Sequence, residues 1–122
     1  MLDLYSDAGW TLYTKDPGQL KEAIDGSQYV VQARDDGKLI GLVRCISDGK
    51  TIAYVQDLLV LKSYRRCGIG TALMRMVMDK YRHVRQLVLL TDDTAELHEF
   101  YESLGLAEAK SCKLAAFVRT GK

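Results

Sequence analysis

Residues 57–71 read DLLVLKSYRRCGIGT, an apolar run that leads into a basic turn with two glycines. Downstream, as far as about Arg82, apolar side chains recur at the spacing of one helix face. They are Ile69, Leu73, Met76, Val77 and Tyr81. The hydrophobic period therefore changes from two to 3.6, which predicts a strand, a turn and a helix that begins near Gly68.

The turn has the features of an anion-binding loop. The first N–H groups of a helix have no acceptor within the helix, and the helix dipole adds partial positive charge there. Glycines let phosphate oxygens approach the backbone, and Arg65 and Arg66 add two positive charges. A tight turn with two solvated arginines explains the same residues, and spacing alone does not separate the two interpretations.

Two other phosphate-binding loops do not fit these residues. The chain contains no Gly-x-x-x-x-Gly-Lys-Ser/Thr motif, which argues against a nucleoside triphosphatase loop. The third glycine of a Gly-x-Gly-x-x-Gly motif would fall at Leu73.

Upstream of this stretch, the chain predicts an antiparallel meander. Two turns, Asp36-Gly37 and Ser47-Asp48-Gly49-Lys50, supply the positive φ that tight hairpins need. They separate three β-rich runs, Tyr29–Val31, Leu39–Ile46 and Ile52–Leu61.

The segment before the meander has room for one clear helix. Asp16-Pro17 is a good cap and first-turn pair, and the helix extends to Ile24. Trp10–Tyr13 is ambiguous and could form a short strand.

Downstream of the crossover helix, the pattern predicts a strand, a helix and a final strand. Gln86–Leu90 reads as a buried strand, and the helical crossover makes it parallel to the strand before it. The next helix opens with Asp93 and Glu96 in a capping-box arrangement and ends at Gly105. Lys113–Arg119 is the predicted last strand. The order indicates an α+β fold with a mixed sheet.

Composition limits the function classes. The 122 residues are 48% hydrophobic, which fits a single domain over residues 1–122. The 17 basic and 16 acidic residues leave a net charge of +1, so neither nucleic acid nor an anionic membrane is favoured as a partner. We expect a soluble cytoplasmic protein, because no signal segment or membrane span is evident. Three scattered cysteines and two histidines predict reduced thiols, solvated histidines and no metal site.

Two motifs resemble the GNAT N-acetyltransferase superfamily. Other residues further resemble a group of its small bacterial members, namely Trp10, Asp48-Gly49, Gln56-Asp57 and Thr91–Thr94. The pattern Arg-x-x-Gly-x-Gly, at Arg65, Gly68 and Gly70 after an apolar strand, resembles the acyl-CoA pyrophosphate loop. Phe100–Leu106 resembles the Phe-Tyr-x-x-x-Gly-Phe signature of a later helix, with Leu106 in place of the last Phe. The resemblance implies a central mixed sheet with flanking helices, in which the fourth and fifth strands are parallel and splay apart.

The resemblance further implies acetyl-CoA as co-substrate. The pantetheine arm would pair with strand backbone at the splay, at Leu58, Leu59 and Val60. Thr94 stands where the family often has an asparagine that contacts this arm. The pyrophosphate would lie on the loop formed by Arg65, Arg66, Cys67, Gly68, Ile69, Gly70 and Thr71, with the Cys67 thiol itself a bystander.

Two residues are candidates for catalysis. A lysine-like amine is only about one part in a thousand neutral near pH 7, so a site must remove its proton, and Asp57 is the candidate base. The simpler interpretation of Asp57 is a strand-end carboxylate that is paired with an arginine or caps a turn. Tyr101 matches the tyrosine that protonates the coenzyme sulfur in many GNAT enzymes. Without the resemblance, Tyr101 reads as a core aromatic on the helix face.

The function expected is transfer of acetyl from acetyl-CoA to a small-molecule or peptidic primary amine, by direct attack in a ternary complex. The alternative is a module that binds acyl-CoA for sensing or protein interaction without turnover, because the acceptor-side region is short and the base is uncertain. The amine site is either open or completed by a second subunit in a homodimer. A nucleic-acid-binding domain is a distant third, because no concentrated basic face is evident.

Overall fold

The structure is a computed structural model, and it describes residues 2–7 and 15–120. The predicted strand at Trp10–Tyr13 lies outside the described residues. The chain divides into two compact units, Met1–Leu90 and Thr91–Lys122.

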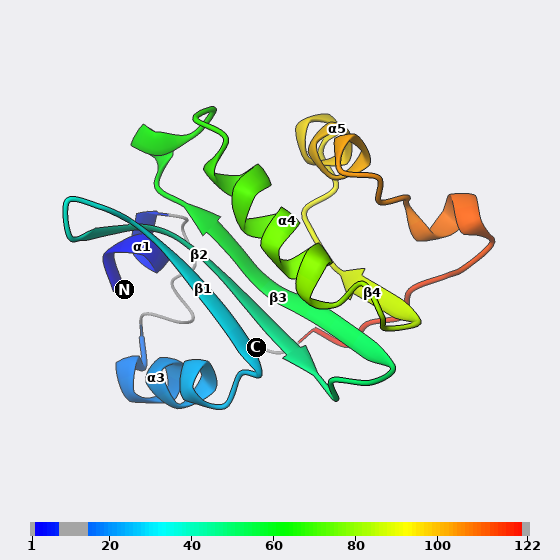
Figure 1. Cartoon of the computed structure of the whole chain (residues 1–122), viewed down its shortest axis with the longest axis horizontal. Coiled ribbons are helices and arrows are strands. Elements are labelled where there is room, and N and C mark those ends of the chain that lie inside the picture. The colour runs from blue at the N-terminus through cyan, green and yellow to red at the C-terminus, as the bar shows by residue number, and fades with distance from the viewer. Residues whose placement is uncertain (1, 8–14, 121–122) are drawn as a thin grey trace. The chain divides into compact units, whose positions relative to one another are not determined.

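A four-stranded mixed sheet forms the first unit (Figure 1). Neighbouring strands follow chain order, β1 (Tyr29–Asp35), β2 (Lys38–Ser47), β3 (Ile52–Val60) and β4 (Gln86–Leu89). The first three strands pair antiparallel, and β4 pairs parallel to β3. The predicted α+β architecture, with a meander followed by a parallel strand, is confirmed.

Both hairpin turns use positive φ, as predicted. Asp36 and Gly37 have φ of 50° and 83°, which a two-residue turn of the mirror-image type requires. At the second turn Gly49 has φ of 75°, and the Asp48 carboxylate accepts the Thr51 hydroxyl proton and several backbone N–H groups. The backbone donors are Lys50, Thr51 and Ile52. These hydrogen bonds hold the pKa of Asp48 below its ordinary value.

The crossover helix α4 (Ile69–Lys80) packs closely on one face of the sheet. A Cβ on Gly41 of β2 would lie 3.2 Å from the Ile69 side chain and 3.3 Å from that of Leu73. A larger residue at this position would therefore require the α4 side chains to shift, and glycine lets the helix approach closely.

Helices α1 (Leu2–Asp7) and α3 (Pro17–Asp25) lie on the opposite face. Leu42 follows Gly41 in β2 and so points away from α4. It joins the buried cluster of Leu4, Tyr5, Leu20, Ile40, Leu42, Leu59 and Leu61. The predicted helix α3 begins as expected, because the Asp16 side chain accepts the Gln19 N–H. The expectation of one helix before the sheet is wrong, because the structure also contains α1. The sequence did not indicate this helix because it is too short to show a helical period.

A β-bulge in β3 changes which side chains face each helix layer. Arg44 opposes Asp57, whereas the next residue of β2, Cys45, opposes Val55, so Gln56 is the extra residue of the bulge. Consecutive residues of β2 point to opposite faces, and cross-strand partners share a face. Val55 therefore faces α4, and Asp57 faces α1 and α3.

The two parallel strands separate half-way along β3. The β3–β4 ladder ends at the pair Val55 and Leu89, but β3 continues to Val60. The backbone of Gln56–Val60 therefore lies beyond the ladder with β4, which agrees with the predicted splay.

The second unit contains α5 (Ala95–Ser103) and a short 3-10 turn at Ala109–Cys112. The predicted capping box at Asp93 is wrong by one residue. Thr94 is the N-cap, and its hydroxyl accepts the Leu97 N–H at 3.2 Å. The extended backbone of Thr94 brings its shorter side chain to that position. Gly105 ends the helix with φ of 91°, as predicted.

The predicted strand at Lys113–Arg119 is also wrong. These residues have no strand structure, and the Phe117 side chain is 96% exposed. A strand needs a neighbour for its N–H and C=O groups, and residues 91–120 contain no other strand. An apolar run alone is therefore insufficient to predict a strand here.

The second hairpin yields a stability prediction. Replacing Asp48→Ala removes an acceptor shared by four donors, so the urea midpoint at pH 7 should fall. Because the folded pKa of Asp48 is lowered, its contribution is present above about pH 3.9 and lost as the pH falls further. The difference between the variant and the parent should therefore shrink in acid. Asp79→Ala, at an exposed position on α4, is the control and should change little.

Candidate functional site

The start of α4 presents backbone N–H groups that have no acceptor within the helix. The first helical hydrogen bond runs from the Ala72 N–H to the Gly68 carbonyl. The N–H groups of Ile69, Gly70 and Thr71 precede it and so have no acceptor within the helix. Gly68 is the N-cap, with φ of 80° and no side-chain cap. Nothing from the N-cap side chain therefore competes with an anion for these amides.

The loop before α4 bends its backbone in a way that favours anion binding. Arg66 has φ of 67°, which is unusual outside glycine, and Gly68 has φ of 80°. Left-handed residues in a turn direct successive N–H groups into a concave nest. The Cys67 thiol contacts the Arg65 carbonyl of the same loop at 3.7 Å, which supports the view of it as a bystander.

Two carboxylates from elsewhere in the first unit anchor this loop. The Lys62 N–H donates to Asp7 Oδ2 at 2.8 Å, and the Tyr64 hydroxyl donates to Asp35 Oδ2 at 2.7 Å. The bond to Asp35 raises the pKa of Tyr64. Sequence analysis missed both carboxylates, because Asp7 and Asp35 lie 55 and 29 residues from their partners and carry no local signal.

The predicted pantetheine-binding residues lie on the unpaired half of β3. Leu59 is buried in the cluster with α1 and α3, while Leu58 and Val60 are half-buried. Their backbone N–H and C=O groups on the β4 side have no strand partner after Val55. Such an edge can accept an extended chain that carries amides.

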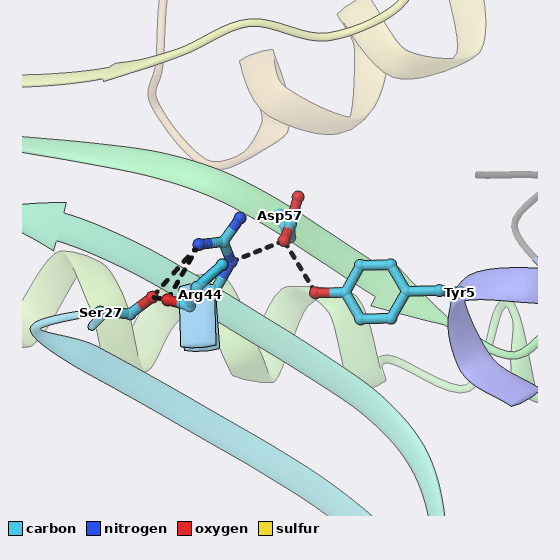
Figure 2. Close-up of polar contacts among 5 residues, drawn as sticks. Tyr5, Ser27, Arg44 and Asp57 are labelled. Atoms are coloured by element: carbon cyan, nitrogen blue, oxygen red, sulfur yellow. Dashed lines mark hydrogen bonds and ion pairs between the residues drawn. The ribbon is translucent and has the colours of Figure 1, made fainter. Parts of the chain in front are cut away.

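Asp57 sits in a buried hydrogen-bond network (Figure 2). Its side chain is fully buried, and Oδ2 accepts from Arg44 Nε and from the Tyr5 hydroxyl, both at 2.7 Å. Arg44 Nη1 also donates to Ser27 Oγ and to the Ala23 carbonyl. The predicted pairing of Asp57 with an arginine is confirmed, but Asp57 lies within β3 and not at a strand end. Its role as base stays a prediction.

The second oxygen of Asp57 is left open. Within the part of the chain that the structure describes, Oδ1 is buried and has no hydrogen-bond partner. Figure 2 shows this oxygen pointing away from both Arg44 and Tyr5. A buried carboxylate oxygen without a donor is costly, so a ligand N–H that reached it would be stabilised.

Sequence analysis did not find the partners of Asp57. Arg44 lies in a predicted strand but reads as an ordinary polar residue, and Tyr5 lies in the helix that was not predicted. The only signal for Arg44 was its position in the β2 sequence, where a charged residue lies between the apolar residues Val43 and Cys45.

Tyr101 and Thr94 belong to the second unit. Tyr101 is half-buried in α5, and burial raises the pKa of its phenol. The Thr91 hydroxyl, its hydrogen-bond neighbour, acts in the opposite direction. The phenol is thus protonated at neutral pH and able to donate. Thr94 uses its hydroxyl oxygen to cap the helix, so its predicted contact with the pantetheine arm stays a prediction.

The two histidines are not merely solvated, contrary to expectation. His98 Nε2 lies 2.6 Å from Asp93 Oδ1, and its Nδ1 lies 3.2 Å from Glu108 Oε2. The hydrogen bond to Asp93 raises the pKa of His98. His83 contacts the Gly49 carbonyl at 2.8 Å. Both are held by local partners, and no group of three metal-ligating side chains occurs within residues 2–7 and 15–120.

The sequence model of the acetyltransferase (GNAT) family matches residues 1–106. The chain belongs to the GNAT acetyltransferase family. Its match includes the loop at the start of α4, the splayed strands and the motif around Tyr101. The resemblance inferred from the two motifs is therefore confirmed.

Relatives of this GNAT chain carry acetyltransferase names. A solved GNAT-family acetyltransferase of Streptococcus pneumoniae is 31% identical, with a TM-score of 0.88 over 99% of this chain and 88% of that one. N-alpha-acetyltransferase 30 of Schizosaccharomyces pombe is 36% identical over 85 residues. A Gibberella zeae protein named as an acetyltransferase is 27% identical over 118 residues. These comparisons cover 64% and 87% of this chain, respectively. The GNAT chain spans only 57% and 64% of those two curated relatives.

Among the described residues of the GNAT chain, no helix combines the length and hydrophobicity that a bilayer crossing needs.

The left-handed N-cap yields a second prediction. Gly68→Ala should lower the free energy of unfolding by about 1 to 2 kcal/mol, because a Cβ is unfavourable at φ of 80° although no atom lies near it. Urea denaturation measures the change. Gly18→Ala in the first turn of α3 is the matched control, since its φ is not positive and its Cβ meets only an ordinary contact. An equal effect of the two variants would contradict the role of the backbone at Gly68.

Proposed function

We propose that this chain transfers an acetyl group from acetyl-CoA to a primary amine, by direct attack within a ternary complex. The observation that carries the proposal is that β3 extends beyond its ladder with β4 and leads to a helix start whose first amides have no acceptor within the helix. Membership of the GNAT family, which uses acetyl-CoA, and the acetyltransferase names of relatives support it.

The residues on the coenzyme side fit the parts of acetyl-CoA. The diphosphate would be held by the N–H groups of Ile69, Gly70 and Thr71 and by the side chains of Arg65 and Arg66. The pantetheine amides would pair with the backbone of Leu58–Val60. The Leu59 side chain would stay in the core, because only its backbone takes part. Acetyl-CoA supplies the activated acyl group as a thioester.

The reaction requires a neutral amine and a protonated leaving sulfur. The amine nitrogen forms a bond to the acyl carbon, the carbon–sulfur bond breaks, and the nitrogen loses one proton to solvent. In our proposal the Tyr101 phenol gives its proton to the sulfur and regains one from solvent. Asp57 acts on the acceptor side, through the open oxygen Oδ1.

A second candidate function is acyl-CoA sensing without turnover. It is favoured by the pairing of Asp57 with Arg44, because this carboxylate is already engaged. Both candidates predict saturable binding of acetyl-CoA. A thiol-release assay with a broad panel of amines separates them, since tight binding without release of CoA would favour the sensor.

The finer predictions about assembly and location stay predictions. A homodimer is supported by the exposed apolar side chains Leu114, Phe117 and Val118 in the second unit. That residues 1–122 act as one catalytic domain, that the protein is cytoplasmic and that its source is bacterial remain expectations from the sequence.

The diphosphate site can be tested with Gly70→Asp. An acidic side chain suits a helix N-terminus, so the fold should persist, but its carboxylate would compete with the diphosphate for the same N–H groups. We expect acetyl-CoA affinity to fall roughly tenfold or more by calorimetry. Gly18→Asp is the matched control, because it places the same charge at the second residue of α3. Equal affinities of both variants would refute the proposed site.

The proton donor can be tested with Tyr101→Phe. Loss of the phenol proton should lower kcat by about 100-fold and leave the KM for acetyl-CoA nearly unchanged. Tyr29→Phe is the control, because Tyr29 packs edge-on against Tyr81 in the first unit. Unchanged turnover of the Tyr101 variant would remove this residue from the mechanism.

A further inference from the structure

We propose that the acceptor is a weakly basic amine of the α-amino class, which binds Asp57 Oδ1 in its uncharged form. This inference rests on the proposed acetyl transfer and narrows its acceptor. It follows from the hydrogen bonds and the charge balance around one buried ion pair.

The hydrogen bonds of Asp57 leave one place for a ligand donor. Arg44 and Tyr5 both donate to Oδ2, and within the described residues Oδ1 has no partner. The position lies on β3 immediately before Leu58, where the backbone that would hold the pantetheine arm begins. An amine that donates one N–H to Oδ1 is thus oriented beside the predicted path of the thioester.

The charge of this carboxylate is already balanced. The side chains of Arg44 and Asp57 are 6% and 0% exposed, and their charges cancel. The pair also bonds the Tyr5 hydroxyl of α1, the Ala23 carbonyl of α3 and the Ser27 hydroxyl after that helix, none of which carries a charge. An ammonium group would therefore add an uncompensated buried charge, whereas a neutral amine would not.

Moving the amine proton onto Asp57 would not remove this problem. A protonated Asp57 would leave the Arg44 guanidinium buried without a counter-charge, which is strongly unfavourable. Asp57 is then a residue that orients the amine and does not store its proton. This role differs from the base expected from the sequence, and the amine has to lose its proton before it binds.

The requirement discriminates among amines by their basicity. An α-amino group has a pKa of about 7.7–8.0, and a lysine side chain about 10.4. At pH 7.4 roughly a quarter of the first is neutral, against about one part in a thousand of the second. The greater nucleophilicity of the alkylamine offsets part of this ratio. We therefore expect a preference of about 100-fold for the α-amine at this pH.

The test compares two acceptor peptides with acetyl-CoA in a thiol-release assay from pH 6.5 to 9.5. One peptide has a free α-amine and no lysine, and the other has a blocked N-terminus and one lysine. For the α-amine, kcat/KM should level off above about pH 8, and for lysine it should rise about tenfold per pH unit. The preference near 100-fold at pH 7.4 should narrow as the pH rises.

Three results would overturn the inference. Equal kcat/KM values at pH 7.4, or a lysine profile that is flat with pH, would show that the site removes the amine proton itself. If the protein binds acetyl-CoA but acetylates neither peptide, the proposed acetyl transfer and the inference are both overturned. That last outcome favours the sensor and is distinct from the first two.

Asp57→Asn tests the orienting role. Arg44 and Tyr5 both donate, so the new amide oxygen must take the place of Oδ2, and the NH2 group, a donor, would face the amine. The KM for the α-amine peptide should rise about tenfold, while the KM for acetyl-CoA stays unchanged. Asp79→Asn, at an exposed position on α4, is the control. An unchanged amine KM would overturn the proposal.

Tyr5→Phe keeps the test decisive if the Asp57 variant does not fold. It removes one donor to Oδ2 and retains the carboxylate and its ion pair. The freed side chain should orient the amine less well, so the KM for the α-amine peptide should rise two- to threefold with acetyl-CoA affinity preserved. The same KM as the parent would contradict an orienting role for this network.

Discussion

The β-bulge at Gln56 is the constraint on which the first unit depends. A regular strand would place Val55 and Asp57 on the same face, because they are two residues apart. The bulge turns them to opposite faces, so that Val55 packs towards α4 and Asp57 towards α1 and α3. The parallel ladder with β4 also ends at Val55. The bulge at one residue thus lies where the buried side chains of β3 change face, next to the buried carboxylate of Asp57, and where the ladder with β4 ends.

The buried ion pair ties the N-terminal helices to this point. Arg44 reaches α3 through the Ala23 carbonyl and the turn after it through Ser27, while Tyr5 of α1 shares the same oxygen of Asp57. Removing one partner of such a pair is costly, because the other charge remains buried. The network therefore specifies how α1 and α3 pack on the sheet. It also explains why the chemistry at Asp57 must conserve the charge of the pair.

The loop at the start of α4 works through its backbone. Positive φ at Arg66 and Gly68 directs N–H groups outwards, and the side chains of Asp7 and Asp35 hold the loop from two other elements. Backbone donors on a rigid turn bind an anion with little loss of entropy on binding. The GNAT family membership of the chain and this geometry agree, although they rest on separate observations.

Local patterns were sufficient for the meander, the crossover helix, the parallel strand after it and the two motifs at Gly68 and Tyr101, whereas the splay was expected from the family resemblance. Hydrophobic period and turn residues act between near neighbours, so they can be read along the chain. The tertiary structure alone showed the pairing of Arg44 with Asp57, the helix that carries Tyr5, and the tail at Lys113–Arg119 without a strand partner. Each of these depends on groups that are distant in sequence, and an ion pair or a strand exists only when its partner is placed beside it.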